Sequence, residues 1–311
     1  MNTDYAATNR PSMIRTDVKQ PLKLGQEVVD YVNELIIKGG PERFEYQKLI
    51  DFVATLDENL VEEYRALLRP ALTLDTLQGW TFNKPFGYAG DFMIIEKIYQ
   101  RYVNPDIRYS NWDRFYQHQH AAQAVRNRKD YFIQTCQGMI RSKAGERNVL
   151  ILGSGPATDV FEFNRLHPEH KLSFDLIDWD QRAIDYASEK NHDYLDRMRF
   201  MRMNVLRYDT HKRYDLIWSA GLFDYFKEKH FAYTLRKFNA LLNPGGEMVI
   251  GNFSKGNPTQ GLMEVMGAWY LNYRSEEELL DLGEEAGIME ENMYVDREPL
   301  GINLFLRIIN L

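Results

Sequence analysis

The sequence predicts an α/β fold built on a parallel sheet and preceded by an all-helical region. From residue 148 onward, short apolar runs typical of buried strands alternate with stretches of helical spacing. Residues 20–145 instead show helical spacing and no clear strand alternation. The first apolar run, 148–152, ends in the glycine turn 153–156 and leads directly into a helical stretch, which is how a nucleotide-binding α/β domain begins.

The apolar periodicity divides the chain into three parts and predicts the elements in each. We expect a flexible polar arm over residues 1–20, a helical cap domain over 21–145 and a Rossmann-like domain over 146–311. The helices predicted in the cap span 24–36, 44–56, 60–68, 92–102 and 111–140. The predicted strands span 148–152, 172–178, 200–203, 214–219, 247–253, 293–297 and 303–309. Two late helices are predicted over 258–270 and 275–286.

Two features of the cap suggest ligand contacts. The loop 84–91 contains two glycines, a proline and two aromatic residues, and loops of this kind carry ligand contacts more often than helices do. On the long helix 111–140, the side chains of Tyr116, His120, Gln123 and Asn127 would share one face. Such a polar face is usually solvated, but this helix leads into the first strand, so we expect its end to lie beside the ligand crevice.

Composition excludes several classes of function. The 311 residues carry a net charge of -7 at a pI near 5.6, which argues against nucleic-acid binding because that requires a basic footprint. Cys136 is the single cysteine, so no disulfide framework exists, and we expect a cytoplasmic protein with Cys136 in its core. We find no apolar run long enough to span a membrane, no secretory signal and no Cys/His cluster for a metal. The sequence does not decide whether the protein forms a homodimer.

The residues that end the predicted strands carry the chemistry, because ligands of open α/β sheets lie beyond the carboxyl ends of the strands. Asp178 ends the second strand and suits ribose hydroxyls, while Trp179 could stack on a purine. Asn204 follows the third strand and could pair with the edge of an adenine. The fourth strand ends in the small residues 219–221, which leave room for the other end of the ligand.

A dinucleotide-dependent oxidoreductase fits these features less well. It would need a third glycine in the turn, where this chain has Ala157, and a pyrophosphate at the glycine turn.

Together, the segments resemble those of the class I S-adenosylmethionine-dependent methyltransferases. The resemblance is carried by LILGSGPATD, LIDWD, RMNV, YDLIWSAGLFDYF and LLNPGGEMVIGNF and covers residues 147–311. It implies a seven-stranded sheet whose last strand is antiparallel, with S-adenosylmethionine as the cofactor. The predicted cofactor-binding residues are Gly153, Ser154, Gly155, Pro156, Asp159, Asp178, Trp179, Asp180, Asn204, Val205, Ser219, Ala220 and Gly221.

A narrower resemblance covers both parts of the chain. The segments KPFGYAGDFMIIEKIY, AVRNRK, SAGLFDYF, GNFSKGNPT and WYLNYRSEEEL are similar to those of bacterial methyltransferases that form 3-hydroxy fatty acid methyl esters. This resemblance implies O-methylation of a carboxylate on a fatty-acid-like or natural-product acceptor.

The acceptor decides which side chains the reaction needs. A carboxylate is ionised at pH 7 and needs a hydrogen-bond donor or cation but no base, and Arg126, Arg128 and Arg274 are the candidate anchors. The candidate donors are Tyr88, Tyr225 and Tyr273. The predicted catalytic residues are Tyr88, His120, Arg126, Tyr225 and Arg274. An apolar acceptor pocket is predicted from the loop 85–92, the stretch 222–226, Met263, Met266 and Trp269.

Two other functions stay open at this point. A hydroxyl- or amine-bearing acceptor would require a base, for which His118 and His120 are the candidates. A binding module that senses the nucleoside without catalysis is the third hypothesis. A nucleic-acid methyltransferase is disfavoured, because SAGL follows the fourth strand where those enzymes carry an Asn/Asp-Pro-Pro-aromatic motif.

Overall fold

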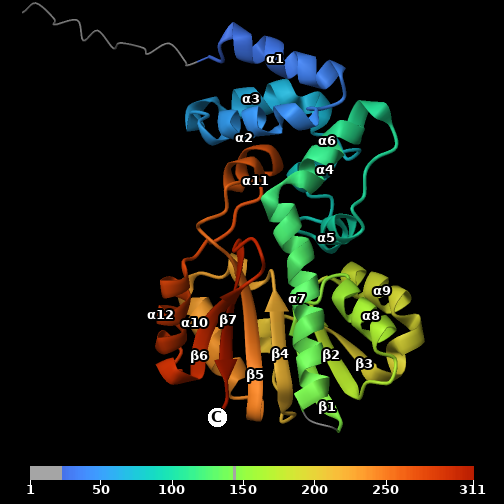
Figure 1. Ribbon diagram of the computed structural model, residues 1–311, viewed down its shortest axis with the longest axis vertical. Coiled ribbons are helices and arrows are strands. Elements are labelled where there is room, and N and C mark those ends of the chain that lie inside the picture. Colours follow the sequence, from blue (N-terminus) through green and yellow to red (C-terminus); the bar gives the residue numbers. More distant parts are fainter. Residues whose placement is uncertain (1–22, 143–144) are drawn as a thin grey trace, which may run out of the picture.

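The computed structural model describes residues 23–142 and 145–311, so the predicted N-terminal arm lies outside the described residues. A group of helices stands above a twisted sheet with helices on both faces (Figure 1). The helices before the sheet are α1 (Gln26–Ile37), α2 (Tyr46–Ala54), α3 (Val61–Leu68), α4 (Leu77–Asn83), α5 (Phe92–Tyr99), α6 (Ile107–His118) and α7 (His120–Ser142). The later ones are α8 (Thr158–Leu166), α9 (Gln181–Lys190), α10 (Glu228–Asn239), α11 (Gln260–Gly267) and α12 (Glu276–Glu285).

The sheet has seven strands in the order β3-β2-β1-β4-β5-β7-β6, which confirms the predicted fold class. Pairing is parallel from β3 to β5, whereas β7 lies antiparallel between β5 and β6. The strands are β1 (Arg147–Leu152), β2 (Leu172–Asp178), β3 (Met198–Arg202), β4 (Tyr214–Ala220), β5 (Leu242–Phe253), β6 (Met293–Arg297) and β7 (Asn303–Ile309). The order reverses between β1 and β4, and a crevice for ligands forms at such a point.

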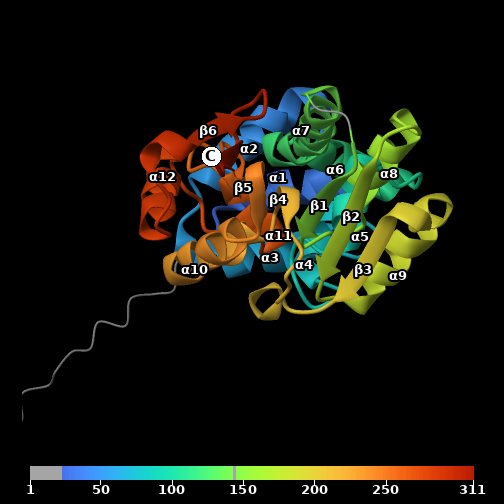
Figure 2. The same ribbon diagram turned by 90° about the horizontal axis from the view of Figure 1, so that it is seen from below.

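Two hydrophobic layers hold helices against the sheet. Phe132, Cys136 and Phe163 are fully buried where α7 and α8 pack on one face, and α9 joins them through Ala187. The opposite face packs against α10 and α12, with Phe231 of α10 buried in that layer. Figure 2 shows α8 and α9 on one side of the strands and α10 and α12 on the other. The carboxyl edge of the sheet is therefore fixed from both faces.

The predicted helix over 111–140 is wrong, because the chain breaks there into α6 and α7. Gln119 is extended (φ -59°, ψ 142°) between the two helices. The break is held by a tertiary contact, since the Thr259 hydroxyl accepts a hydrogen bond from the backbone N–H of Ala121. Tyr116 is buried on α6, whereas His120 is exposed at the start of α7, so the predicted polar face does not form.

Other differences from the predicted elements are smaller. α4 was not predicted, and it begins where the Thr76 side chain accepts from the backbone of Gly79. The late helix predicted over 258–270 is only α11, and it ends before the left-handed residue Ala268. β5 begins at Leu242 rather than 247, because Leu242 already pairs with Tyr214 before the register shifts to the pair of Leu216 and Glu247. The capping box of Ser275 and Glu278 at α12 is present as predicted.

α11 joins the helices that precede the sheet, although it follows β5 in the sequence. Its residues Leu262 and Met266 lie in the hydrophobic cluster formed by α1, α2, α3 and α6. We retain the division into a cap and a Rossmann-like domain as a proposal, with α11 added to the cap. This arrangement places one segment of the late chain directly above the carboxyl edge of the sheet (Figure 1).

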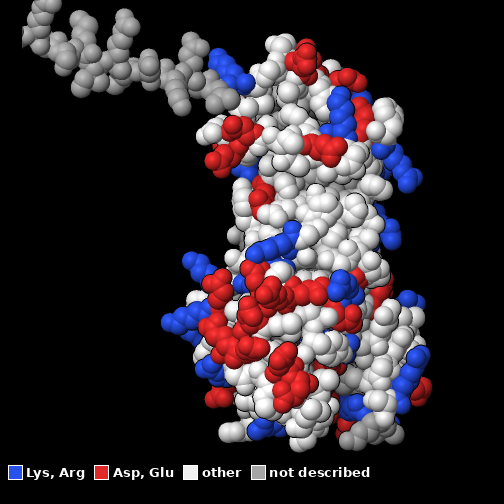
Figure 3. Space-filling view, turned by 60° about the vertical axis from the view of Figure 1, so that its left-hand side comes forward, with Lys and Arg blue, Asp and Glu red and all other residues white. Residues whose placement is uncertain are grey.

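Acidic side chains gather on the lower half of the molecule in Figure 3, on the side where α12 lies in Figure 1. α12 itself carries Glu276, Glu277, Glu278, Asp281, Glu284 and Glu285. Such a face repels a polyanion. None of the helices in the described ranges combines the length and hydropathy that a membrane span requires.

A buried ion pair links the cap to the Rossmann-like domain. Glu96 of α5 is 1% exposed, and its Oε1 accepts a 2.6 Å hydrogen bond from Nζ of Lys190 on α9. The hydroxyl of Thr158 on α8 donates to Oε2 of Glu96 and accepts from Lys190 at 2.8 Å. One carboxylate therefore holds three helices together.

Replacing Lys190 with Met should lower the free energy of unfolding by about 2 to 4 kcal/mol, because it leaves the Glu96 carboxylate buried without its cation. Chemical denaturation monitored by circular dichroism measures this change. The double variant E96Q/K190M should lose clearly less, since no charge remains buried. Equal losses in the two variants would contradict the assignment.

Candidate active site

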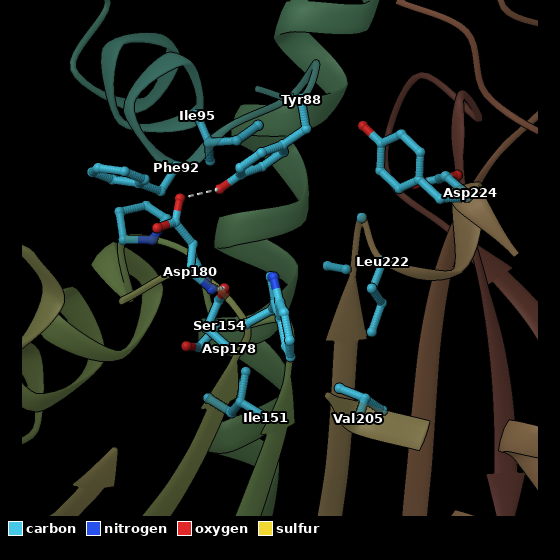
Figure 4. A pocket seen from close by; sticks show the side chains of 18 of the residues that line it. Tyr88, Phe92, Ile95, Ile151, Ser154, Asp178, Asp180, Val205, Leu222 and Asp224 are labelled. Carbon is cyan, nitrogen blue, oxygen red and sulfur yellow. Dashed lines mark hydrogen bonds between the residues drawn. The ribbon is translucent and has the colours of Figure 1, made fainter. Parts of the chain in front are cut away.

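The main cavity lies at the carboxyl edge of the sheet, under the loop 84–91, and has a volume of about 390 Å³. In Figure 4, Ser154 and Asp178 border it from the strand ends, while Tyr88 and Ile95 border it from the cap. Leu222 and Asp224 close the side that follows β4. The cavity therefore lies where the order of the strands reverses.

The glycine turn forms one wall of this cavity and is tied to β2. Gly153 and Gly155 have φ values of 70° and 54°, which only glycine adopts readily. The amides of Gly153 and Ser154 both donate to the Ile177 carbonyl, and the amide of Gly155 donates to Oδ2 of Asp178 at 2.8 Å. These amides are therefore used within the protein, and the turn presents its Cα atoms and the Ser154 side chain to the cavity.

Asp178 lies at the end of β2, as predicted, and lines the cavity. Its Oδ1 accepts from the amide of Asp180 at 2.9 Å, and burial raises the pKa of its carboxyl group above the usual value. Trp179 beside it is 69% exposed, with its ring free to stack on a planar ligand. Asp180 caps α9 through the amide of Arg182 and also lines the cavity.

Most of the other predicted cofactor-binding residues also line the cavity. They are Pro156, Asp159, Asn204, Val205, Ala220 and Gly221. Oδ1 of Asn204 already accepts from the amide of Leu206, which leaves the side-chain NH₂ group for a ligand. Ser219 is the exception: it is fully buried and its hydroxyl donates to the Leu152 carbonyl, so its role is to join β4 to β1.

Two of the three predicted tyrosine donors, Tyr88 and Tyr225, line the cavity on the side of the cap, whereas Tyr273 does not line it. The hydroxyl of Tyr88 donates to Oδ2 of Asp180 at 3.2 Å, which joins the loop 84–91 to the end of β2 (Figure 4). The hydroxyl of Tyr225 donates to the Ala89 carbonyl and accepts from Nε1 of Trp269. Burial raises the pKa of both hydroxyls, so both tyrosines are protonated hydrogen-bond donors at neutral pH.

Gly90 shows how closely this loop is fitted to the cavity. A Cβ atom at Gly90 would lie 2.5 Å from the Trp269 ring and 2.7 Å from the Tyr225 hydroxyl. Its φ of +69° also favours glycine. The loop 84–91 can therefore cover the cavity only because this position has no side chain.

His120, Arg126 and Arg274 are not among the residues that line the cavity. His120 is exposed, and Arg126 donates to the side-chain and backbone oxygens of Gln117. Burial lowers the pKa of Arg126 to about 10. Arg274 donates to the backbone carbonyls of Phe223 and Phe226, where it holds the segment after β4 in place. The placement of these three residues argues for structural roles.

Arg128 is the arginine that reaches the cavity. It is 6% exposed, hydrogen-bonds to the Tyr99 hydroxyl and leaves its Nε without a partner. A Cβ atom at Gly221 would lie 3.0 Å from its Nη1, so the glycine makes room for the guanidinium. The Ser154 hydroxyl, also buried and in the cavity wall, has no partner either. A cation and a hydroxyl with unused hydrogen bonds suit a carboxylate ligand.

Two acids flank this arginine, of which Asp159 is half-buried and Asp224 is buried. Asp159 lies on α8 and Asp224 after β4, and burial raises the pKa of each carboxyl group to about 6. Oδ1 of Asp224 accepts from the amide of Phe253 at 2.7 Å, which fixes its orientation. Asp224 was not predicted as a site residue, although it lies within the stretch 222–226 that was predicted to line an acceptor pocket.

Residues 149–246 match a family described as "Methyltransferase domain". The chain is thus an S-adenosylmethionine-dependent methyltransferase, and S-adenosylmethionine is its cofactor. No curated protein matches the chain.

Solved structures resemble the chain in fold. A possible exported protein from Bordetella parapertussis is 16% identical with a TM-score of 0.61, covering 91% of this chain and 94% of its own. The S-adenosylmethionine-dependent methyltransferase SibL is 12% identical with a TM-score of 0.49, covering 86% of this chain and 76% of its own. The N-methyltransferase NodS from Bradyrhizobium japonicum, in complex with S-adenosylhomocysteine, is 15% identical with a TM-score of 0.45, and the match covers 70% of this chain and 97% of NodS. The first of these includes the helical part as well as the sheet.

Replacing Asp178 with Ala should weaken the binding of S-adenosylhomocysteine by about 1.5 to 3 kcal/mol, roughly 10- to 150-fold, because a hydrogen bond to a charged group is lost. Isothermal titration calorimetry measures the affinity. D185A, which removes an exposed acid from α9, serves as the control and should bind normally. An unaltered affinity in D178A would rule out a role for this carboxylate in cofactor binding.

Proposed function

We propose that this enzyme methylates a carboxylate oxygen of a small-molecule acceptor with a fatty-acid-like apolar part. The observation that carries the proposal is the character of the cavity wall. Among the described residues that line it there is no histidine and no lysine. A carboxylate acceptor is ionised at neutral pH and does not require the base that an alcohol or amine would need.

The cofactor fits the polar half of the cavity. In the proposed arrangement, Arg128 and Ser154 hold the carboxylate of its methionine part, because their unused hydrogen-bonding groups lie beside the ends of β1 and β4. Asp178 accepts from the ribose hydroxyls, and Asn204 and Trp179 contact the adenine.

The acceptor fits the other half, where the wall is aromatic and apolar. Phe226, Trp269 and Leu271 line this part, together with Tyr225 and Tyr88. The two tyrosine hydroxyls can donate to an acceptor oxygen, in exchange for the bonds they make to Asp180 and Ala89. Covered by the loop 84–91, the acceptor carboxylate would be poorly solvated and therefore more reactive.

When bound, S-adenosylmethionine supplies a methyl group on a sulfonium, so that a carboxylate oxygen forms the new O–C bond while the C–S bond breaks and its electron pair stays on sulfur. No proton is released in this transfer, so no side chain has to accept one. The task of the protein is to orient the two reactants and to exclude water. The similarity of the cap and strand-end segments to those of 3-hydroxy fatty acid methyl ester-forming enzymes supports the same acceptor class.

A second candidate function has one observation in its favour. Asp224 lines the cavity, is buried, and has a pKa raised to about 6 by that burial. Such a carboxylate could serve as the base for a hydroxyl or amine acceptor. His118 and His120, which sequence reasoning had offered for this role, are not among the residues lining the cavity.

Replacing Arg128 with Met should weaken the binding of S-adenosylhomocysteine by about 1.5 to 3 kcal/mol, because a charged hydrogen-bonding partner of its carboxylate is removed. Calorimetric titration measures the change. R141M, at the exposed far end of the same helix, is the control for loss of an arginine from α7. If R128M binds S-adenosylhomocysteine as tightly as the wild type does, Arg128 does not hold the carboxylate of the cofactor.

The transferred group should appear as a methyl ester. With S-adenosylmethionine labelled in its methyl group and a hydroxydecanoate as acceptor, which offers both a carboxylate and a hydroxyl group, we expect a product that releases labelled methanol in alkali. Its rate of formation should change less than about twofold between pH 5 and pH 8, because a carboxylic acid of pKa about 4 to 5 is mostly ionised throughout.

The pH profile also separates the two candidate functions. If Asp224 is a base, it must be ionised, and its pKa of about 6 implies a rate that rises about tenfold from pH 5 to pH 8. Calorimetric binding of the cofactor at each pH controls for effects on affinity. A tenfold rise, or a product stable to alkali, would favour a hydroxyl or amine acceptor instead.

A further inference from the structure

The wall of the active-site cavity carries more negative than positive charge. The charged residues that the structure places in it are Arg128 and the aspartates Asp159, Asp178, Asp180 and Asp224. Of these, Asp180 is compensated from outside the cavity, because Nε of Arg182 lies 2.8 Å from its Oδ1. Three carboxylates and one guanidinium remain in a wall that is otherwise mostly apolar and aromatic.

Asp224 is the buried acid of this wall with an unused oxygen. It is 1% exposed, and within the described ranges only its Oδ1 is hydrogen-bonded, to the amide of Phe253. Arg128 and Arg274 attract its charge without a hydrogen bond to it, and the guanidinium of Arg274 donates to Asn252 instead. A buried carboxylate normally has a charged partner, so the free oxygen of Asp224 leaves a place for a cation.

The position of Asp224 relates it to the middle of the cofactor. In Figure 4, Asp178 and Asp180 lie on one side of the cavity and Asp224 lies on the other. In the arrangement proposed above, Asp178 accepts from the ribose and Arg128 holds the carboxylate of the methionine part. The sulfur atom is covalently joined to both of these parts, so it belongs in the space that the carboxylates of the two walls enclose.

We propose that Asp224 makes the site selective for the sulfonium charge, so that the enzyme binds S-adenosylmethionine more tightly than its product S-adenosylhomocysteine. The two molecules share the ammonium and carboxylate of the methionine part and differ by one methyl group and one positive charge. A wall of net negative charge attracts that additional charge, and does so more strongly in a cavity than in bulk water. The inference rests on the proposed placement of the cofactor and is independent of the acceptor.

Selectivity of this kind acts on the exchange of product for cofactor. The positive charge is present when the cofactor binds and is absent once the methyl group has been transferred, so the attraction that retains the cofactor does not retain the product. Because the attraction weakens as the charge is dispersed during transfer, it does not accelerate the transfer itself. Asp224 is then a specificity-determining residue, and a carboxylate acceptor leaves it free for this role because it needs no base.

Calorimetric binding of three ligands in the absence of an acceptor tests this inference. S-adenosylmethionine carries the additional charge, as does sinefungin, in which a carbon bearing an ammonium group replaces the sulfonium, whereas S-adenosylhomocysteine does not. The titrations are made at pH 8, where Asp224, with a pKa of about 6, is ionised. The wild type should bind each of the two charged ligands about tenfold more tightly than S-adenosylhomocysteine.

Two variants assign the selectivity to Asp224. D224N keeps the shape of the side chain without its charge, so it should bind the three ligands with affinities within about threefold of one another. Its affinity for S-adenosylhomocysteine should be no weaker than that of the wild type, which also shows that the site is folded. D185N removes an exposed charge from α9 and serves as the matched control, so it should keep the ratio of the wild type.

Equal affinity of the wild type for cofactor and product would overturn the inference, and so would a preference that D224N retains. If D224N weakens all three ligands alike, Asp224 pairs with the ammonium group that they share, and selection by the sulfonium charge is excluded. Failure of the proposed function looks different: the preference for the charged ligands would depend on Asp224 as expected, yet no methyl ester would form.

Discussion

The geometry of the active site depends on the carboxylate of Asp178. One of its oxygens accepts from the amide of Gly155 and the other from the amide of Asp180. These two bonds connect the turn after β1 to the turn after β2, so the walls of the cavity are set by one side chain. Burial raises the pKa of this carboxyl group, and the two amide bonds oppose that rise, so ionisation and the shape of the turn are coupled.

The residues at the strand ends could be predicted from the sequence because parallel strands share one carboxyl edge. Apolar runs identify the strands, and whatever follows Leu152, Asp178 and Ala220 must then lie on the same side of the sheet. This reasoning does not hold for Ser219, one residue earlier. Side chains alternate in direction along β4, and the Ser219 hydroxyl donates to the Leu152 carbonyl instead of facing the cavity. The difference between a wall residue and a structural residue is here a single position.

The helical part could not be predicted to the same precision, because long-range contacts decide it. At the break between α6 and α7, the backbone N–H of Ala121 donates to the hydroxyl of Thr259, which is 138 residues away in the sequence. No sequence signal near Gln119 predicts this break. That break also sets which side of α7 faces the cavity. Arg126 and Arg128 are the same residue type and lie two positions apart, yet Arg126 donates to Gln117 whereas Arg128 lines the cavity.

Two of the buried polar atoms that lack a hydrogen-bond partner lie in the wall of the active-site cavity. They belong to Arg128 of α7 and Ser154 of the glycine turn, and both residues line the cavity. Leaving such atoms unpaired destabilises the free protein, and a ligand that pairs with them recovers that free energy on binding. A ligand lacking the matching group leaves the atom both unpaired and dehydrated, so the same atoms that favour the correct ligand discriminate against its analogues.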